Sequence, residues 1–219
     1  MKTETQIWDE VRAEYRTQRV LLGTYTSYNL LKNPRSLLFS LSRYKFASKM
    51  IGSGKRILEV GCSDGFRSNI LAEFSKEVIG VDIDSEAVQE ASASIKLPNV
   101  QFKNADFMSC DLGKFDALVS MDVIEHIQSE NENKFFSAVK KNLNETGMAV
   151  IGTPNKNAEA YASLPSRVGH INLYTQERLK NVMEQNFKFV QMFSMNDEVV
   201  HTGYHNMAHY LIAVGIMPL

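Results

Sequence analysis

The chain has 219 residues and a formal net charge of −1; 44% of its residues are apolar and 22% are charged. This balance is ordinary for a globular protein, and the lack of any run of about eighteen apolar residues excludes a membrane-spanning helix. The polar N-terminus excludes a signal peptide, and two cysteines, Cys62 and Cys110, do not make a disulfide framework. We therefore expect a cytoplasmic protein with reduced thiols and no membrane partner.

Residues 1–51 are predicted to form a helical cap, and the main domain is predicted to span residues 52–219. A first helix is indicated by apolar residues on one helical stripe: Ile7, Trp8, Val11 and Tyr15. A second helix is expected after Asn33-Pro34, and the polar, aromatic segment 23–33 is interpreted as a linker. Tyr25 and Tyr28 of this linker either line a site beneath the cap or simply pack.

The cap is basic. Residues 1–50 carry a net charge of +5, whereas the remaining 169 residues carry a net charge of −6. Two interpretations remain open, a solvated helix face and an electropositive surface that attracts anionic substrates. Arg16 and Arg19 are the residues with which we would test the second interpretation.

The segment 56–66, RILEVGCSDGF, begins the main domain. Its apolar, β-branched run predicts a buried parallel strand that ends in a turn at Gly61. From Asp64 onward, apolar residues recur at helical spacing, so a helix is expected to start where the loop ends. A strand, a loop with glycines and a helix N-terminus together form a ligand cradle. The next strand ends in Asp82, where an acid accepts hydrogen bonds from a ribose diol.

The spacing of the glycines shows whether this cradle matches a dinucleotide-binding loop. A dinucleotide-binding loop, G-x-G-x-x-G, needs glycines at positions 61, 63 and 66, but Ser63 and Phe66 occupy the last two. Glu59, two residues before Gly61, is placed to face a cationic amino group. The loop therefore does not favour a dinucleotide.

Strands and helices alternate along the rest of the domain, which predicts an α/β fold with a doubly wound, mostly parallel sheet. The seven expected strands lie near residues 57–60, 78–81, 99–103, 115–121, 147–152, 187–193 and 209–216. Ser85 is expected to cap one helix, and a Thr-x-Glu cap is expected to begin another over 175–186. The segment 155–170 lacks clear periodicity, and loops of that length are usually functional or disordered.

The string E-V-G-C-x-x-G resembles motif I of the class I S-adenosylmethionine (SAM) methyltransferases, and Asp82 resembles their ribose-binding acid. The resemblance covers residues 56–155 and implies a seven-stranded, Rossmann-like sheet with strand seven inserted between strands five and six. It also implies that Asp106 reaches the adenine amino group while Phe107 packs on the ring. The expected cofactor-binding residues are Glu59, Gly61, Cys62, Gly65, Asp82, Ile83, Asp106, Phe107 and Met121. Ser63 departs from the family, which usually has glycine there.

The motif D-V-I-E-H at 122–126, followed by T-P-N at 153–155 and a later histidine, is similar to two O-methyltransferase groups. These are the ubiquinone-biosynthesis O-methyltransferases and the small-RNA terminal 2′-O-methyltransferases. Because ligands bind at the carboxyl edge of open α/β sheets, the histidines expected at that edge are candidates for the site. They are His126, His170, His201, His205 and His209.

The resemblance implies methyl transfer from SAM, with O-methylation favoured over nitrogen or carbon acceptors. A hydroxyl must lose its proton, so His126, or else His170, is the expected base, with Glu125 orienting it. The expected acceptor is a small, polar, anionic metabolite, such as a phosphorylated or nucleotide-linked sugar. An RNA 2′-hydroxyl is the alternative acceptor, although no RNA-binding module is evident. A SAM-binding protein without catalysis is the alternative of a different class, and the sequence leaves the oligomeric state open.

A divalent metal is a further hypothesis. Asp122, Glu125 and His126 are spaced i, i+3 and i+4, so on a helical turn they share one face. With His170 they would suit a Mg, Mn or Fe ion, which lowers the pKa of a bound hydroxyl. In the metal-free alternative His126 acts as base or substrate contact, Glu125 orients it and Asp122 caps the turn.

Overall fold

The structure is a computed structural model that describes residues 2–15 and 19–219. Arg16, one of the two arginines chosen to probe the cap, lies outside the described residues. None of the helices within the described ranges is long and apolar enough to cross a membrane.

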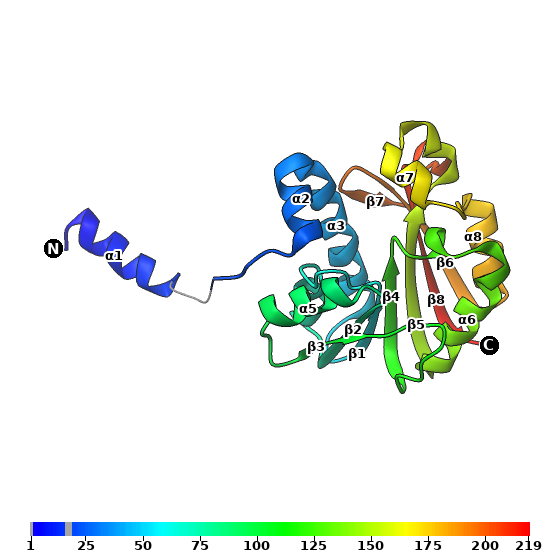
Figure 1. Cartoon of the computed structure of the whole chain (residues 1–219), viewed down its shortest axis with the longest axis horizontal. Helices are drawn as coiled ribbons and strands as arrows, with labels where there is room; N and C mark the ends of the chain where they lie inside the picture. The colour runs from blue at the N-terminus through cyan, green and yellow to red at the C-terminus, as the bar shows by residue number, and fades with distance from the viewer. Residues whose placement is uncertain (1, 16–18) are drawn as a thin grey trace.

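An eight-stranded sheet forms the centre of the molecule, in the order β3-β2-β1-β4-β5-β8-β6-β7 (Figure 1). Its strands are β1 (Arg56–Val60), β2 (Glu77–Asp82), β3 (Val100–Asn104), β4 (Phe115–Met121), β5 (Leu143–Pro154), β6 (Phe187–Asn196), β7 (Val199–His201) and β8 (Tyr210–Pro218). Strands β1 to β5 are parallel, and β8 runs antiparallel between β5 and β6. The doubly wound, mostly parallel sheet is thus confirmed, including the insertion of the last strand. The short edge strand β7 was not predicted.

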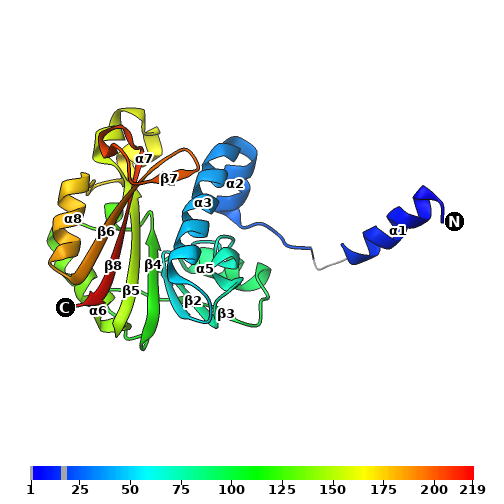
Figure 2. The ribbon, with the colours of Figure 1, turned by 180° about the vertical axis from the view of Figure 1, so that it is seen from behind.

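Two apolar clusters fill the two faces of the sheet. Successive residues of one strand belong to different clusters, as Ile57 and Leu58 do, because their side chains point to opposite faces of the sheet. One cluster includes residues of α6 (Glu132–Asn142) and α8 (Gln176–Glu184), and the other includes residues of α3 (Pro34–Ile51) and α4 (Ser68–Ala72). In the view from behind, α3 runs along the sheet beside β4 (Figure 2).

The N-terminal helices differ from the prediction in two ways. Helix α1 (Glu4–Glu14) buries none of its residues, and its Trp8 is 61% exposed, so its apolar stripe does not pack on the sheet. Figure 1 shows α1 apart from the rest of the chain. The interpretation of 23–33 as a linker is wrong, because α2 (Thr24–Lys32) occupies it.

Helix α2 forms because distant carboxylates cap its first turn. Glu90 accepts a hydrogen bond from the Thr24 backbone N–H at 2.8 Å, and Asp64 accepts one from the Thr26 N–H at 2.6 Å. These acids satisfy the donors that the first turn of a helix leaves free, which its N-cap Gly23 has no side chain to do. Because these capping acids are 66 and 38 residues away in the sequence, no local sequence pattern predicts the start of α2.

Two local boundaries differ from the prediction, and one predicted cap is confirmed. The helix after motif I begins only at Ser68, since a turn occupies the preceding residues. Asp84, rather than Ser85, caps α5 (Ser85–Ser94), because its carboxylate accepts from two backbone N–H groups. The Thr175 cap of α8 is confirmed: its hydroxyl accepts from the Arg178 N–H at 3.2 Å.

Candidate functional site

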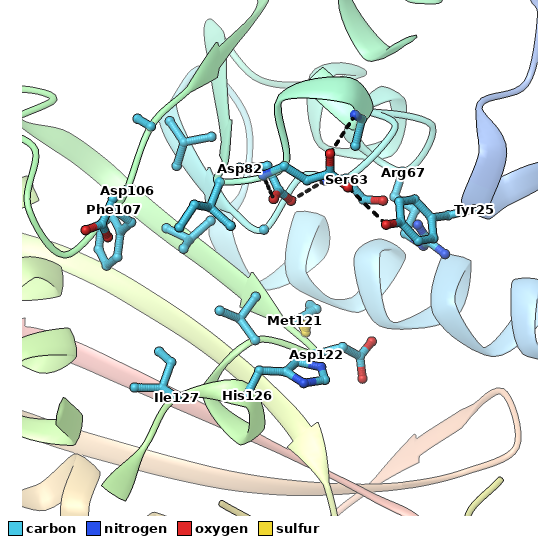
Figure 3. A pocket seen from close by; sticks show the side chains of 18 of the residues that line it. Tyr25, Ser63, Arg67, Asp82, Asp106, Phe107, Met121, Asp122, His126 and Ile127 are labelled. Atoms are coloured by element: carbon cyan, nitrogen blue, oxygen red, sulfur yellow. Dashed lines mark hydrogen bonds between the residues drawn. The ribbon is translucent and has the colours of Figure 1, made fainter. Parts of the chain in front are cut away.

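A cavity of about 640 Å³ lies at the carboxyl edge of the parallel strands, between the ends of β1, β2 and β4 and the helices α2 and α3. Figure 3 shows the side chains around it, with Asp106 and Phe107 apart from the others. Ser63, Asp82 and Tyr25 form one group, and Met121, Asp122 and His126 form another. The cavity therefore joins a region at the first loop to a region at the end of β4.

Backbone geometry in the first loop brings the chain close to the cavity. Gly61 has φ = +80°, and a Cβ there would lie 2.3 Å from a methyl group of Val123. Ser63 has φ = +51°, a left-handed conformation that costs about 1–2 kcal/mol in a residue other than glycine. Its N–H donates to Asp82 at 2.8 Å, which helps to hold this conformation. The serine thus adopts the geometry for which the resembled family uses glycine.

Asp82 is prepared to accept further hydrogen bonds. Its two carboxylate oxygens accept one backbone N–H each, from Ser63 at 2.8 Å and from Asp84 at 3.0 Å. A carboxylate has about four acceptor positions, so each oxygen retains capacity toward the cavity that Asp82 lines. This arrangement fits a ribose diol.

Asp106 and Phe107 line the cavity after β3. Asp106 also caps its own turn, since it accepts from the Met108 N–H at 3.0 Å and from the Ser109 hydroxyl at 2.6 Å. Its oxygens are therefore held in place beside the ring of Phe107, which is 6% exposed. A fixed acceptor beside an apolar ring fits an adenine.

The expected cofactor-binding residues separate into two groups. Those that line the cavity are Gly61, Asp82, Ile83, Asp106, Phe107 and Met121. Glu59, Cys62 and Gly65 instead lie behind its wall. Cys62 is 2% exposed, and burial raises the pKa of its thiol. A Cβ on Gly65 would lie 2.7 Å from Phe102, so this glycine permits close packing of the loop on the sheet.

Glu59 is fully buried and does not line the cavity. One of its oxygens accepts from the Ser68 hydroxyl at 2.5 Å, while the other has no protein partner. Burial raises the pKa of Glu59 to about 7. The structure therefore buries this acid beneath the loop, outside the set of cavity-lining residues, and its contact with the cofactor stays a prediction.

Sequence reasoning missed lining residues from the cap and from the loop. Asn29 and Tyr44 reach the cavity from α2 and α3, and Arg67 reaches it from the turn before α4. Tyr25, a candidate from the sequence, also lines it and donates to Asp84 at 2.9 Å. Tyr28 is 63% exposed and is not among the lining residues. No pattern along the chain could have separated these two tyrosines, because the distinction depends on the rotation of α2.

At the end of β4, Asp122 does not join a helical face with Glu125 and His126, so that expectation is wrong. Asp122 has φ = +57° and precedes the short helix η1 (Ile124–His126). Its carboxylate receives two hydrogen bonds from the Arg43 guanidinium, at 2.7 and 2.9 Å. Arg43 also lies 3.5 Å above the ring of Tyr210. Asp122 is thereby engaged by a cation from α3.

Glu125, His126 and His170 do come together, although they belong to two loops. One potential ligand atom from each lies within 4.8 Å of the others. The imidazoles are 5.1 Å apart, and the N–H at Nδ1 of His126 faces the Gly169 carbonyl oxygen at 2.8 Å. Because a carbonyl only accepts, Nδ1 carries the proton and Nε2 is left as the basic nitrogen. Burial and the neighbouring His126 lower the pKa of His170.

Glu125 is fully buried, and one of its oxygens accepts from the Thr153 hydroxyl at 3.0 Å. The other oxygen has no protein partner. Burial and the charge of Asp122 raise the pKa of Glu125 well above its usual range. A buried carboxylate oxygen without a partner, beside a histidine whose Nδ1 is fixed by a carbonyl, fits the donor set of a divalent cation.

The remaining histidines do not join this cluster. His201 accepts from the Gly203 N–H through its own ring, and His209 lies 6.0 Å from the ring of Tyr161. The His205 backbone carbonyl accepts from Asn155. Of the five histidines, only His126 lines the cavity.

Comparisons with known proteins agree with this geometry. A family of methyltransferase domains matches residues 33–191. The ubiquinone biosynthesis O-methyltransferase of Glaesserella parasuis serovar 5 is 31% identical over 117 residues, which cover 49% of each chain. Its counterpart from Psychrobacter arcticus is 28% identical over 116 residues, covering 50% of this chain and 44% of that protein. The chain thus spans about half the length of these curated relatives.

Solved structures show the same fold. The N-methyltransferase NodS from Bradyrhizobium japonicum, bound to S-adenosyl-L-homocysteine (SAH), has a TM-score of 0.64 at 20% identity, over 88% of this chain and 92% of that one. A TehB-like SAM-dependent methyltransferase from Corynebacterium glutamicum has a TM-score of 0.64 at 17% identity, over 97% and 99%. The family match spans well over half of the chain and the fold agrees, so this chain belongs to the methyltransferase domain family.

Proposed function

We propose that the chain transfers a methyl group from SAM to an oxygen of its acceptor. The observation that carries the proposal is that the cavity with Asp82 and Asp106 ends beside His126, whose Nε2 is free to accept a proton. SAM, when bound, supplies an electrophilic methyl group on a sulfonium. Such a displacement needs alignment more than covalent help, so the residues act mainly by binding, orientation and proton transfer.

In this scheme Asp82 accepts from the ribose hydroxyls, and Asp106 with Phe107 holds the adenine. The acceptor oxygen forms the new bond to the methyl carbon as the bond from carbon to sulfur breaks. Nε2 of His126 takes the hydroxyl proton, while the Gly169 carbonyl keeps the ring in the required tautomer. The lowered pKa of His170 favours its neutral form, which would not repel the imidazolium that forms.

A divalent cation bound to Glu125, His126 and His170 is an alternative form of the proposal, in which Nε2 of His126 would hold the ion instead of accepting the proton. The unpartnered oxygen of Glu125 and the separation of at most 4.8 Å among the ligand atoms support it. Such an ion, Mg, Mn or Fe, would lower the pKa of an acceptor hydroxyl. Asp122 is omitted from the ligand set because Arg43 engages both of its oxygens. Exhaustive chelation followed by metal add-back tests this form, and full activity after chelation excludes it.

The chemical class of the methyl acceptor is supported mainly by the names of relatives. The names of the curated relatives favour an oxygen acceptor, whereas NodS is an N-methyltransferase of the same fold. An anionic acceptor stays a prediction, because Arg19, Lys32 and Lys45 of the basic cap are exposed and are not among the cavity-lining residues.

The test is a transfer assay with SAM that carries a tritiated methyl group. The acceptors are phenols, sugar phosphates, amines and an RNA oligonucleotide with a terminal 2′-hydroxyl. We expect label on an oxygen acceptor, and loss of labelling in His126→Ala. Label on amines alone would overturn the oxygen assignment. SAH binding without transfer to any acceptor would favour the non-catalytic alternative.

A further inference from the structure

The segment 169–175, which carries His170, has little regular structure of its own. It joins α7 (Leu164–Gly169) to α8, and Ile171, the residue after His170, is 51% exposed, so burial does not fix it there. The position of His170 relative to His126 must therefore come from specific contacts. A network of four residues at the far side of this segment supplies them.

Asn172 is the link between that network and the site. It is 4% exposed, and its backbone N–H donates to the Glu125 carbonyl oxygen at 3.0 Å. Its side-chain amide donates to the Tyr174 hydroxyl at 3.1 Å and accepts from Arg178 at 2.7 Å. Two residues from His170, the chain is thus tied to the loop that carries Glu125 and His126.

Arg178 and Glu132 anchor the other end. Arg178 donates to the Glu132 carboxylate at 2.5 Å and to the Leu173 carbonyl oxygen at 3.0 Å, and its guanidinium lies 4.0 Å from the centre of the Tyr174 ring. Tyr174 is fully buried and donates its hydroxyl to the same Glu132 oxygen. Burial and that bond raise the pKa of Tyr174, which keeps the phenol protonated as a donor.

We infer that Arg178 and Glu132 are positioning residues that set the separation of His126 and His170 through Asn172 and Tyr174. The catalytic role of these residues rests on the proposed function, whereas their effect on the separation of the two histidines does not depend on it. Neither Arg178 nor Glu132 is among the cavity-lining residues, so they act through the histidine-bearing segment. The planar guanidinium meets three acceptors while it stacks on a ring, which an ammonium group does not reproduce.

The chain contains a matched control for Arg178. Arg56, at the start of β1 and so at the opposite edge of the sheet from the cavity, donates to Glu77 at 2.6 Å and to the Lys114 carbonyl oxygen at 2.7 Å. It also lies 4.9 Å from the centre of the Phe115 ring, and its exposure is 40%, against 36% for Arg178. The two arginines therefore make similar contacts, but only Arg178 is connected to His170.

The experiment compares Arg178→Ala, Arg178→Lys and Arg56→Ala in the full chain saturated with SAH. Nuclear Overhauser effects between the His126 and His170 rings report their proximity directly and need no acceptor. We expect them to be lost in Arg178→Ala, weakened in Arg178→Lys and retained in Arg56→Ala, with SAH affinity unchanged in all three. With an acceptor in hand, kcat should fall about 100-fold in Arg178→Ala without a matching rise in the KM for SAM, because misplacement by about 1 Å has such effects.

Retained ring contacts in Arg178→Ala, or equal losses in Arg178→Ala and Arg56→Ala, would overturn the inference. If Arg178→Ala loses SAH binding, Glu132→Gln decides in its place, because it keeps the shape of the side chain and removes only the charge. A chain that lacks methyl transfer but shows the expected changes in ring contacts would contradict the proposed function and leave the positioning role standing.

Discussion

The two ends of the cavity are built differently. The end at β1, β2 and β3 is lined by residues that lie at or just after the carboxyl end of a strand, such as Gly61, Asp82 and Asp106. The end at β4 is lined by Tyr44 of α3 and by Asp122 and His126, and Arg43 bonds to Asp122 across 79 residues of sequence. The ring of His170, which does not line the cavity, lies 5.1 Å from that of His126. The first end depends on local backbone geometry, whereas the second depends on tertiary contacts.

In the proposed function, this difference separates cofactor binding at the first end from proton transfer at the second. Acids at the first end hold positions fixed by neighbouring N–H groups, as Asp82 does. Groups at the second end have their protonation set by burial and by each other, as with Glu125 and His170. Perturbed pKa values of this kind are concentrated at functional sites. Substitutions at the two ends should therefore have separable effects on SAH affinity and on turnover.

The largest expected effect is on turnover. His126→Ala should lower kcat by about 10²- to 10⁴-fold, the range usual for loss of a general base, while SAH affinity stays unchanged. His209→Ala is the matched control, since it lies at the same edge of the sheet but outside the His126 cluster. Steady-state kinetics and calorimetry with SAH measure the two quantities. Equal losses in both variants would remove His126 from its proposed role.

The second-largest expected effect is on the affinity for the cofactor product SAH. Asp82→Ala removes hydrogen bonds to a ribose diol, worth about 1–3 kcal/mol, so SAH affinity should fall about 5- to 150-fold. Asp111→Ala is the control, because that acid is exposed and pairs with Lys141. Calorimetry gives both dissociation constants. An unchanged affinity in Asp82→Ala would contradict the assignment of the whole first end.

The same contrast explains what the sequence could predict. Motif I and the acids after β2 and β3 were found because each depends on a strand end and a short spacing. The segment 23–33, which was predicted to be a linker, forms α2. The sequence did not indicate this helix because its capping acids, Asp64 and Glu90, lie later in the chain. The expected helical face with Asp122 failed because Arg43, a residue of another element, holds Asp122 in a left-handed conformation. Glu59 could be placed on its strand, but its side-chain environment could not.

Helix α2 offers a smaller effect that tests this contrast. Thr26 is fully buried, and its hydroxyl donates to Asp64 at 2.8 Å, so Thr26→Val should cost about 1–3 kcal/mol by leaving a buried acceptor without its donor. Thr24→Val is the control, because the Thr24 hydroxyl bonds to Glu90 at the surface. We expect a clear fall in melting temperature only for Thr26→Val. Similar melting temperatures for the two variants would mean that α2 is not held by Asp64.

The last expected effect concerns Glu59, and it appears only as a dependence on pH. The folded pKa is raised to about 7 from an ordinary value of 4.5, so between these values the unfolded chain ionises while the folded chain keeps its proton. The folded state then binds more protons than the unfolded state, and the free energy of unfolding decreases as pH rises through this window. Glu59→Gln removes this titration, so its stability relative to the wild type should increase from pH 4.5 to pH 7 and then stay level.

Glu77→Gln is the control, because that acid is partly exposed and paired with Arg56. Urea midpoints at pH 5, 6, 7 and 8 measure the slope, and parallel curves for Glu59→Gln and the wild type would contradict it. Unchanged SAH affinity in Glu59→Gln would support the buried position of this acid, whereas a large loss would favour the amino-group contact expected from the sequence.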